Sequence, residues 1–357
     1  MLKILHIAPM NYAGVPYDFY KMHNSVGDQS RIITLHKNER EFAEDICLNL
    51  PLPNFLAAKK WRKKKMQEVE NGVHKVDFFK PKNLFEKFYF NINDKLKTKT
   101  INKVIENYNL NDFDIIHYDS GLDFYRNAKQ AIKWKKEGKK IVCCYYGSDL
   151  RLRGLIKELD EISDLNITSE FDHLNMKSDL EYLFYPYDIS ELPQKNNSQK
   201  EKIKIIHSPT NRKYKGTELI IDVINKIKKE KNIEFLLIEN MNRSKLLNIK
   251  SSCDICIDQV GGSMGGTGYG KAGLETLGME IPTITNMSNE YLNWLPENPF
   301  VVANNKEELY DKLNELIENK NLRNDLGKKG KAWVIKYHGF ENVDKELKKL
   351  YRQKNII

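Results

Sequence analysis

The residues whose types and spacing could perform chemistry are concentrated in one stretch, 254–275. Its apolar, β-branched start at 255–260 predicts a buried strand, and six glycines follow between Gly261 and Gly270. A helix is predicted directly afterwards, over 271–279. Glycine lets the backbone approach an anion, and the first N–H groups of a helix favour negative charge. The stretch therefore predicts a site for the diphosphate of a nucleotide.

Two side chains add to this predicted site. Lys271 supplies a positive charge, and Glu275 can accept hydrogen bonds from the paired hydroxyls of a sugar. The GxGxxG pattern at 268–273 indicates NAD or FAD only weakly, because it lies in the last third of the chain and Asn293 stands where an acid is expected. A surface loop that binds nothing is the simpler alternative.

A second cationic loop follows the strand predicted at 203–207. Arg212 offers a planar fork to phosphate oxygens, and Lys215 offers a point charge. Thr217 is expected to cap the helix that begins there. Two cations opposite a glycine-rich helix start would hold a diphosphate from both sides, whereas merely solvated charges are the alternative.

The elements that must position these loops are strands alternating with helices, which predict parallel, doubly wound α/β sheets. The polar segment 188–202 has no hydrophobic period and predicts a linker. We expect an N-terminal domain at 1–188, a linker at 189–201 and a C-terminal domain at 202–341. Ligands of such folds bind at the carboxyl ends of the strands, so a cleft between the two sheets is expected.

The strands expected in the first domain are 3–10, 31–35, 46–50, 114–119, 140–146, 165–168 and 182–185, with helices at 55–110 and 124–137. Those expected in the second are 203–207, 233–238, 255–260 and 283–285, with helices at 217–228, 244–249 and 271–279 and three more in the tail.

Composition sets the broad class. The chain has 357 residues, is 40% hydrophobic, and contains no apolar run of the roughly 18 residues that span a bilayer. Its start has no signal-peptide layout, and five cysteines fit a reduced, cytoplasmic setting. Cys253 and Cys256 form a CxxC without a second pair or a histidine cluster, so buried thiols are favoured over a zinc site.

The net charge of +9 is concentrated in one region. Residues 51–100 hold 13 lysines and arginines against 5 acids, with the densest run at 59–65 around a tryptophan. Such a run predicts peripheral contact with anionic lipid at the inner face of the cytoplasmic membrane, and a solvated helix face is the alternative. Nucleic acid is not expected as a partner, because no nucleic-acid module is present.

At this point the chain resembles the GT-B-fold glycosyltransferases, and most closely glycosyltransferase family 4. The resemblance is carried by 208–212 with 215–217, by 254–259, by Gly268-Tyr-Gly270 with Glu275, and by 145–151. It implies two doubly wound Rossmann-like domains facing each other across a cleft, with a final helix, about 342–354, packing back on the first domain. It also implies that Arg212 and Lys215 bind the donor diphosphate, that Glu275 binds the ribose and that the first domain holds the acceptor.

Together, these arguments predict three groups of site residues. The predicted catalytic residues are Arg212, Lys215, Glu275 and Asp149. The predicted donor-binding residues are Asn211, Gly265, Gly266, Thr267, Gly268, Tyr269, Gly270, Lys271 and Glu275. The predicted acceptor-binding residues are Asn11, Gly14, Asp119, Tyr146 and Arg151. Asp119 and Asp149 are the carboxylates expected to face the acceptor, and solvated acids of surface loops are the alternative.

Two positions depart from the family pattern. Thr267 stands eight residues before Glu275, where the family often has a glutamate that touches the donor sugar. Tyr146 stands where the family often has a histidine. Either change could alter the choice of donor or mark a relative with weak activity.

The expected function is transfer of a hexose-like sugar from a nucleotide-diphosphate sugar, UDP favoured over GDP, to a hydroxyl of a glycan or lipid-linked acceptor. Retention is implied by the resemblance, and the lack of an Asp-x-Asp triplet in a suitable loop favours a metal-independent reaction without a cofactor. The abundance of Lys, Asn and Ile suggests a bacterial source and surface polysaccharide synthesis. A GT-B-fold sugar-nucleotide 2-epimerase and a catalytically weak nucleotide-sugar-binding relative are the alternatives.

Overall fold

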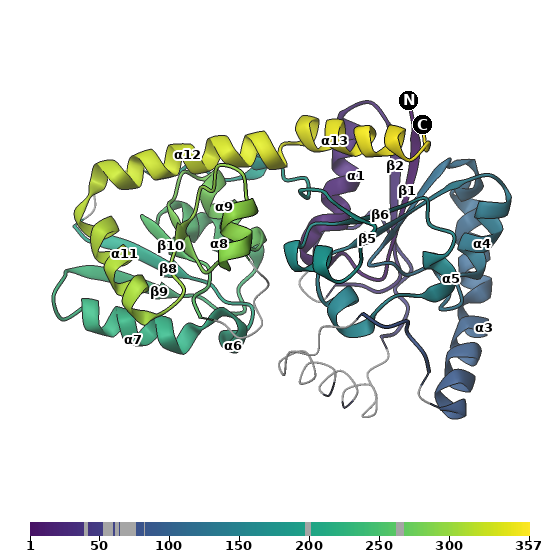
Figure 1. Ribbon diagram of the computed structural model, residues 1–357, viewed down its shortest axis with the longest axis horizontal. Helices are drawn as coiled ribbons and strands as arrows, with labels where there is room; N and C mark the ends of the chain where they lie inside the picture. The colour runs from purple at the N-terminus through teal and green to yellow at the C-terminus, as the bar shows by residue number, and fades with distance from the viewer. Residues whose placement is uncertain are drawn as a thin grey trace. The chain divides into compact units, whose positions relative to one another are not determined.

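The computed structural model of the 357-residue chain describes residues 1–38, 42–52, 60, 64, 76–81, 83–196, 201–261 and 268–357. The chain forms two compact units (Figure 1). Unit 1 is Met1–Pro186 together with Phe340–Ile357, and unit 2 is Tyr187–Gly339. The residues 262–267 and most of 53–75 lie outside the described residues, so the predictions made for Gly265, Gly266, Thr267 and most of 59–65 are not addressed below.

Unit 1 contains a seven-stranded parallel sheet in the order β3-β2-β1-β4-β5-β6-β7. Its strands are β1 (Lys3–Ala8), β2 (Gln29–Thr34), β3 (Ile46–Cys47), β4 (Ile115–Asp119), β5 (Lys140–Tyr145), β6 (Leu165–Thr168) and β7 (Leu180–Tyr182). Its helices include α1 (Val15–Ser25), α3 (Leu84–Asn107), α4 (Lys129–Lys136), α5 (Lys157–Asp160) and α13 (Phe340–Gln353). The strand order reverses at β1, which lies between β2 and β4, and this reversal defines the switch point of a doubly wound sheet.

Two predicted helices of unit 1 begin later than expected. The sequence predicts a helix over 55–110, but the described residues 76–81 are not helical. Instead, α3 begins at Leu84, where the Asn83 side chain accepts the N–H of Glu86.

The sequence also predicts a helix over 124–137, whereas α4 begins at Lys129 because Ala128 has a left-handed backbone with φ of 52°. Phe124 and Tyr125 nevertheless face the core, since they are buried in the preceding turn. Apolar spacing thus indicated the buried side chains correctly, but it could not indicate the backbone break.

Unit 2 contains a five-stranded parallel sheet in the order β12-β11-β10-β8-β9. Its strands are β8 (Ile203–His207), β9 (Ile233–Leu237), β10 (Ile255–Ile257), β11 (Thr283–Thr285) and β12 (Val301–Val302). The α-helices described in it are α6 (Arg212–Lys215), α7 (Thr217–Ile227), α8 (Arg243–Ser251), α9 (Lys271–Gly278), α10 (Asn289–Trp294), α11 (Lys306–Glu318) and α12 (Lys320–His338). The sequence did not predict β12, because two residues are too few to show a period.

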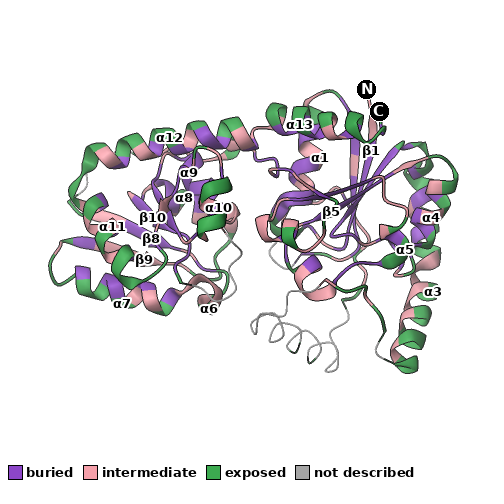
Figure 2. Ribbon diagram, viewed as in Figure 1, coloured by how far each residue is buried: buried purple, intermediate pink, exposed green. Residues whose placement is uncertain are grey.

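The sheet of unit 2 has a core on each face. Ile205 and Ile206 are consecutive residues of β8 and therefore point to opposite faces. Ile205 belongs to the core that includes residues of α7 and α11, and Ile206 to the smaller core with Leu247 of α8. Figure 2 shows the strands as largely buried and the outer faces of the helices as exposed.

The first part of the segment predicted as a linker is packed on unit 2. Asn196 donates its backbone N–H to the carbonyl of Ser251 at 2.9 Å. Gly278 of α9 lies so close to this segment that a Cβ there would be 2.6 Å from Leu192 and 3.2 Å from Ile189. Two apolar side chains in an otherwise polar run therefore fix it to the unit. Among the described residues, no helix is long and apolar enough to cross a membrane.

Candidate functional site

The first part of the candidate site is a lysine held beside the start of α9. Lys215 ends the short helix α6, and its Nζ lies 2.8 Å from Asp258 Oδ1 and 2.8 Å from Gln259 Oε1. Asp258 and Gln259 directly follow β10, so the carboxyl edge of the sheet positions both acceptors. Asn211 begins α6 by accepting the N–H of Tyr214 at 3.2 Å.

The same two acceptors also hold the described end of the glycine-rich turn. Asp258 Oδ2 accepts the backbone N–H of Gly270 at 3.2 Å, and Gln259 Nε2 donates to the carbonyl of Gly268 at 2.5 Å. A Cβ on Gly270 would lie 3.7 Å from Lys215 Nζ, so the ammonium group lies next to the backbone that begins α9. A cation beside a helix N-terminus is an arrangement suited to an anion.

Burial and charge act against each other on Asp258. Burial alone would raise the pKa of this carboxyl, but the Lys215 ammonium, its hydrogen bond and the Gly270 amide outweigh burial and lower the pKa below its usual value. Asp258 therefore stays ionised at neutral pH and keeps Lys215 in place.

Arg212 lies in the same loop but points at two carboxylates. Its Nη1 is 2.8 Å from Glu239 Oε2, and its Nε is 2.8 Å from Glu218 Oε1. The side chain is 40% exposed, so a phosphate can reach it only in competition with these acids. Its diphosphate role stays a prediction.

Glu275 was predicted to accept hydrogen bonds from sugar hydroxyls, and the structure gives its carboxylate two cationic partners. Oε2 lies 2.7 Å from Nζ of the fully buried Lys250, and Oε1 lies 3.0 Å from Nε of Arg243. Burial alone would raise the pKa of Glu275, but Lys250 and then Arg243 outweigh it and lower the pKa. Sequence reasoning missed Lys250 and Arg243, because nothing in their own helix marks them as partners of a residue in α9.

The predicted cap of α7 is wrong. Gly216, with φ of 64°, is the residue before α7, and Thr217 is buried with its Oγ1 2.8 Å from His207 Nε2. His207 Nδ1 lies 2.8 Å from the carbonyl of Ile257. Burial lowers the pKa of His207 to about 4, so the imidazole is neutral and serves to join β8, β10 and α7.

Tyr269, a predicted donor-binding residue, points into an aromatic cluster of unit 2. Its ring stacks on Phe300 with centroids 4.7 Å apart, and its hydroxyl is 2.9 Å from His338 Nε2. Gly268 lies against the ring of Tyr291, where a Cβ would not fit. Lys271, the first residue of α9, places its Nζ over the ring of Tyr187 at 5.5 Å.

In unit 1, Asp119 was predicted to face the acceptor, and its position excludes the alternative of a solvated acid in a surface loop. It is the last residue of β4 and is completely buried. Its Oδ2 is 3.0 Å from His6 Nδ1, and its Oδ1 accepts a hydrogen bond from the hydroxyl of Tyr146. Burial, followed by the charge of Asp119, raises the pKa of Tyr146 well above its usual value. Asp119 therefore orients Tyr146, and Tyr146 is the residue of this pair nearer the surface.

The other predicted loop residues of unit 1 hold their own loops. Asp149 accepts the backbone N–H groups of Tyr146, Gly147 and Leu150 at 2.7–2.9 Å and so closes a tight turn. Arg151 is fixed by Asp172, whose Oδ2 is 2.6 Å from its Nε, and by Glu170.

Asn11 and Gly14 shape the start of α1. Asn11 is buried, donates to the carbonyl of Ala43 at 2.7 Å and accepts the N–H of Tyr17 at 3.4 Å. Gly14 precedes α1 in the left-handed conformation, with φ of 78°. Contact of these residues with an acceptor stays a prediction.

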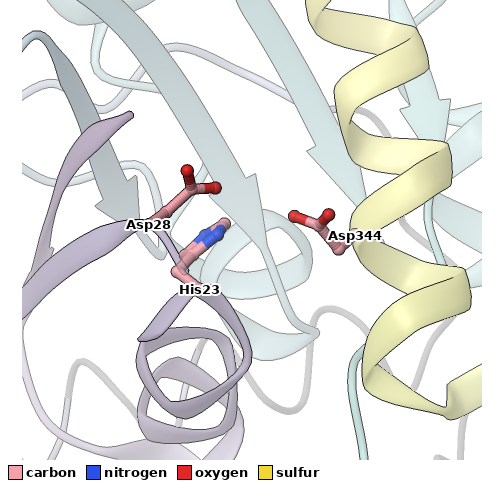
Figure 3. A group of neighbouring side chains, drawn as sticks. All are labelled: His23, Asp28 and Asp344. Atoms are coloured by element: carbon pink, nitrogen blue, oxygen red, sulfur yellow. The ribbon is translucent and has the colours of Figure 1, made fainter. Parts of the chain in front are cut away.

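A separate polar cluster in unit 1 joins α1, the residue that precedes β2, and α13. The side chains of His23, Asp28 and Asp344 point toward one another (Figure 3). One imidazole nitrogen of His23 and one carboxylate oxygen of each aspartate, the atoms that could bind a metal ion, lie within 4.8 Å of one another. Lys348 Nζ lies 2.8 Å from Asp28 and 3.0 Å from Asp344, so an ammonium already supplies these carboxylates with a cation. We therefore interpret the cluster as the attachment of α13.

No family model and no curated protein sequence matches this chain. Solved structures do match it over nearly its whole length. HepE of Anabaena, in complex with UDP and glucose, has a TM-score of 0.58 at 12% identity and covers 99% of this chain and 100% of its own. TarM of S. aureus, in a complex that contains UDP, has a TM-score of 0.57 at 10% identity and covers 98% and 100%.

The catalytic domain of starch synthase IV from Arabidopsis thaliana, bound to ADP and acarbose, has a TM-score of 0.54 at 10% identity and covers 99% of each chain. At such identities the likeness is one of fold. It confirms the predicted fold class, so the chain has the GT-B fold, whereas the narrower resemblance to glycosyltransferase family 4 stays a prediction.

Proposed function

We propose that this protein transfers a sugar from a nucleotide-diphosphate sugar to a hydroxyl group of an acceptor. The observation that carries the proposal is Lys215, which Asp258 and Gln259 hold beside the N-terminus of α9. The three similar structures described above contain UDP or ADP, which supports a nucleoside diphosphate as the ligand of this chain and favours UDP.

The proposed chemistry follows from the charge that develops at the leaving group. Breaking the bond between the sugar and the diphosphate leaves negative charge on the diphosphate. Lys215, Lys271 and the first N–H groups of α9 would stabilise that charge, and one preorganised contact of this kind contributes about 2.7–4 kcal/mol. Arg212 would add a further contact after exchanging Glu218 or Glu239 for phosphate.

The finer features are part of the same proposal. The donor is a UDP-sugar, the acceptor is a glycan or a lipid-linked glycan, and transfer proceeds with retention, without a metal ion or cofactor, in bacterial surface polysaccharide synthesis. Tyr146 and the turn closed by Asp149 would meet the acceptor in unit 1. The basic run 59–65 would provide a peripheral contact with anionic membrane.

A thermal-shift and calorimetric comparison of UDP, GDP, CMP and NAD tests the donor site. A ligand at about 100 times its dissociation constant stabilises a protein by about 2.7 kcal/mol. UDP should raise the melting temperature of the wild type and of Lys213→Ala, an exposed residue of α6 that serves as the matched control. The shift should be lost in Lys215→Ala and reduced in Arg212→Ala.

Lys215→Ala leaves the buried Asp258 without its cation and could therefore destabilise the protein by itself. The melting temperature of this variant is therefore also measured without ligand, and the UDP shift is taken relative to that value. Arg212→Ala removes a side chain that is 40% exposed, so this variant should stay folded. It therefore tests the UDP site without a loss of stability. A shift with NAD alone, or a UDP shift that survives both substitutions, would contradict the proposed site.

Product analysis separates the transferase from its alternatives. With UDP-sugar and a suitable acceptor, a transferase releases UDP and forms a glycoside. A 2-epimerase converts the UDP-sugar to its epimer without any acceptor, and a binding relative leaves the bound donor unchanged.

A further inference from the structure

The outward face of α3 in unit 1 is apolar over its first half. Leu84, Phe85, Phe88 and Leu96 are exposed by 80, 86, 66 and 76%, and Ile92 is exposed by 41%. Residues that are three, four or seven positions apart share one face of a helix, so these side chains form a single stripe. Figure 2 shows this end of α3 as mostly exposed. A contiguous exposed apolar stripe of this kind marks an interaction surface.

The rotation of α3 is set by contacts on its opposite face. Ile101 and Ile105 are buried in the core of unit 1. Nearer the start of the helix, the ring of Phe90 lies 5.8 Å from that of Phe79 and 4.1 Å from the guanidinium of Arg126. Because these contacts fix one face against the unit, the apolar stripe points away from it.

Lysines continue the same face along the second half of α3. Lys95, Lys99 and Lys103 are each four residues apart and exposed. None of the three forms an ion pair with another residue in the described part of the chain. Asp94 lies on the inner side, where it pairs with Lys97 at 2.8 Å. The outward face therefore presents apolar side chains together with three lysines, and the two carboxylates of this stretch, Glu86 and Asp94, lie on other faces of the helix.

We propose that the outward face of α3 binds the surface of a bilayer that contains anionic lipid. The apolar stripe would enter the boundary between headgroups and acyl chains, with α3 lying along the surface, and the lysines would contact the anionic headgroups. The charge of the face favours lipid over an uncharged apolar partner. The surface is distinct from the predicted run at 59–65, and the proposal does not depend on the transfer reaction.

Vesicle flotation of the full chain tests this surface. The protein is mixed with vesicles of phosphatidylcholine alone or of an equal mixture with phosphatidylglycerol. Wild type should float with the mixed vesicles and far less with the neutral ones. Each lysine near an anionic surface changes partitioning by about fivefold, so reversing three should lower it by at least about 100-fold. The variants are Lys95→Glu/Lys99→Glu/Lys103→Glu and Phe85→Ser/Phe88→Ser.

The matched control reverses three exposed lysines of α12 in unit 2, Lys320→Glu/Lys328→Glu/Lys329→Glu, which gives the same change in net charge. This control should bind more than tenfold better than the α3 lysine variant. Both α3 variants should keep the wild-type melting temperature and the wild-type UDP shift, since the altered side chains are exposed and lie in unit 1. A loss of flotation with an unchanged UDP shift therefore concerns the α3 surface alone, whereas a missing UDP shift in wild type concerns the donor site alone.

Three outcomes would overturn the proposal. One is equal flotation with neutral and mixed vesicles. Another is unchanged flotation of Phe85→Ser/Phe88→Ser. The third is a wild-type dimer, seen by sedimentation, that the phenylalanine variant converts to a monomer while vesicle binding is absent, because the stripe would then be covered by a second copy of the chain.

Discussion

Lys250 and Glu275 form an ion pair inside unit 2, with Nζ 2.7 Å from Oε2 and no exposed surface on Lys250. The pair joins the end of α8 to the middle of α9. The other oxygen of Glu275 holds Arg243, which also lies 3.3 Å from the hydroxyl of Tyr187. The helix that begins at the proposed diphosphate site is therefore fixed from behind by a carboxylate with two cations.

Lys250→Met should destabilise unit 2 strongly. Removing one partner of a buried ion pair leaves the other charge uncompensated and costs about 3–5 kcal/mol. We expect the lower part of that range, because Arg243 still pairs with Glu275. Urea unfolding monitored by tryptophan fluorescence measures the effect, with the exposed Lys245→Met on the same helix as the control. Equal unfolding midpoints for the two variants would contradict this role.

Acid should weaken unit 2 through Asp258 and Glu275. Both have a pKa that is lower in the folded protein than in the unfolded chain. Their contribution to stability is therefore complete above the unfolded values of about 4 and is lost as the pH falls through the folded values. Urea midpoints measured from neutral pH downward should fall most steeply below about pH 4. Glu275→Gln should flatten this decline, and a decline as steep as that of wild type would exclude the glutamate as a contributor.

Tyr146→Phe should destabilise unit 1 and leave the donor site intact. The substitution removes the hydroxyl that donates to the buried Asp119 carboxylate, and an unsatisfied buried group costs about 1–3 kcal/mol. Chemical unfolding measures this cost, and the exposed Tyr108→Phe provides a control that should behave as wild type. Under the proposed function, UDP binding should be unchanged while kcat/KM for the acceptor falls. Loss of UDP binding instead would place Tyr146 at the donor.

Lys348→Met should loosen α13 from unit 1. The substitution leaves the buried Asp28 and Asp344 carboxylates without their shared cation, at a cost of about 3 kcal/mol. Hydrogen exchange of the α13 amides should accelerate, whereas Lys349→Met, an exposed neighbour on the helix, should leave exchange unchanged. Protection of α13 that is equal in both variants would show that other contacts hold the helix.

Much of the fold could be predicted because its strands are short, apolar and bounded by polar turns. The bounds expected for β6, β8 and β11 agree with the structure to the residue. For α4 and α7, where the predicted helix start or cap was wrong, the cause was the backbone conformation of a single residue. Ala128 ends one helix pattern with a positive φ, and Gly216 takes the cap position that Thr217 was expected to fill. Neither backbone conformation changes the spacing of the apolar residues, so the sequence pattern does not reveal it.

The candidate site was harder to predict, because its partners are far apart in sequence. Glycines and cations near a strand end indicated Lys215 and the start of α9, but nothing indicated that Lys250 faces Glu275, 25 positions away. Asp119 was expected in a loop that faces the acceptor because it ends a predicted strand. Its actual environment depends on His6, which is 113 positions away and lies in the neighbouring strand.

The membership of α13 in unit 1 has a consequence for how the chain is made. This helix packs beside α1 (Figure 1). Its Tyr351 hydroxyl forms a hydrogen bond with the imidazole of His117 in β4. During synthesis, every residue of unit 2 leaves the ribosome before α13 does. The sheet of unit 2 is therefore synthesised before the helix that covers the buried histidines His23 and His117 of unit 1. The domain that is begun first is therefore the one that is completed last.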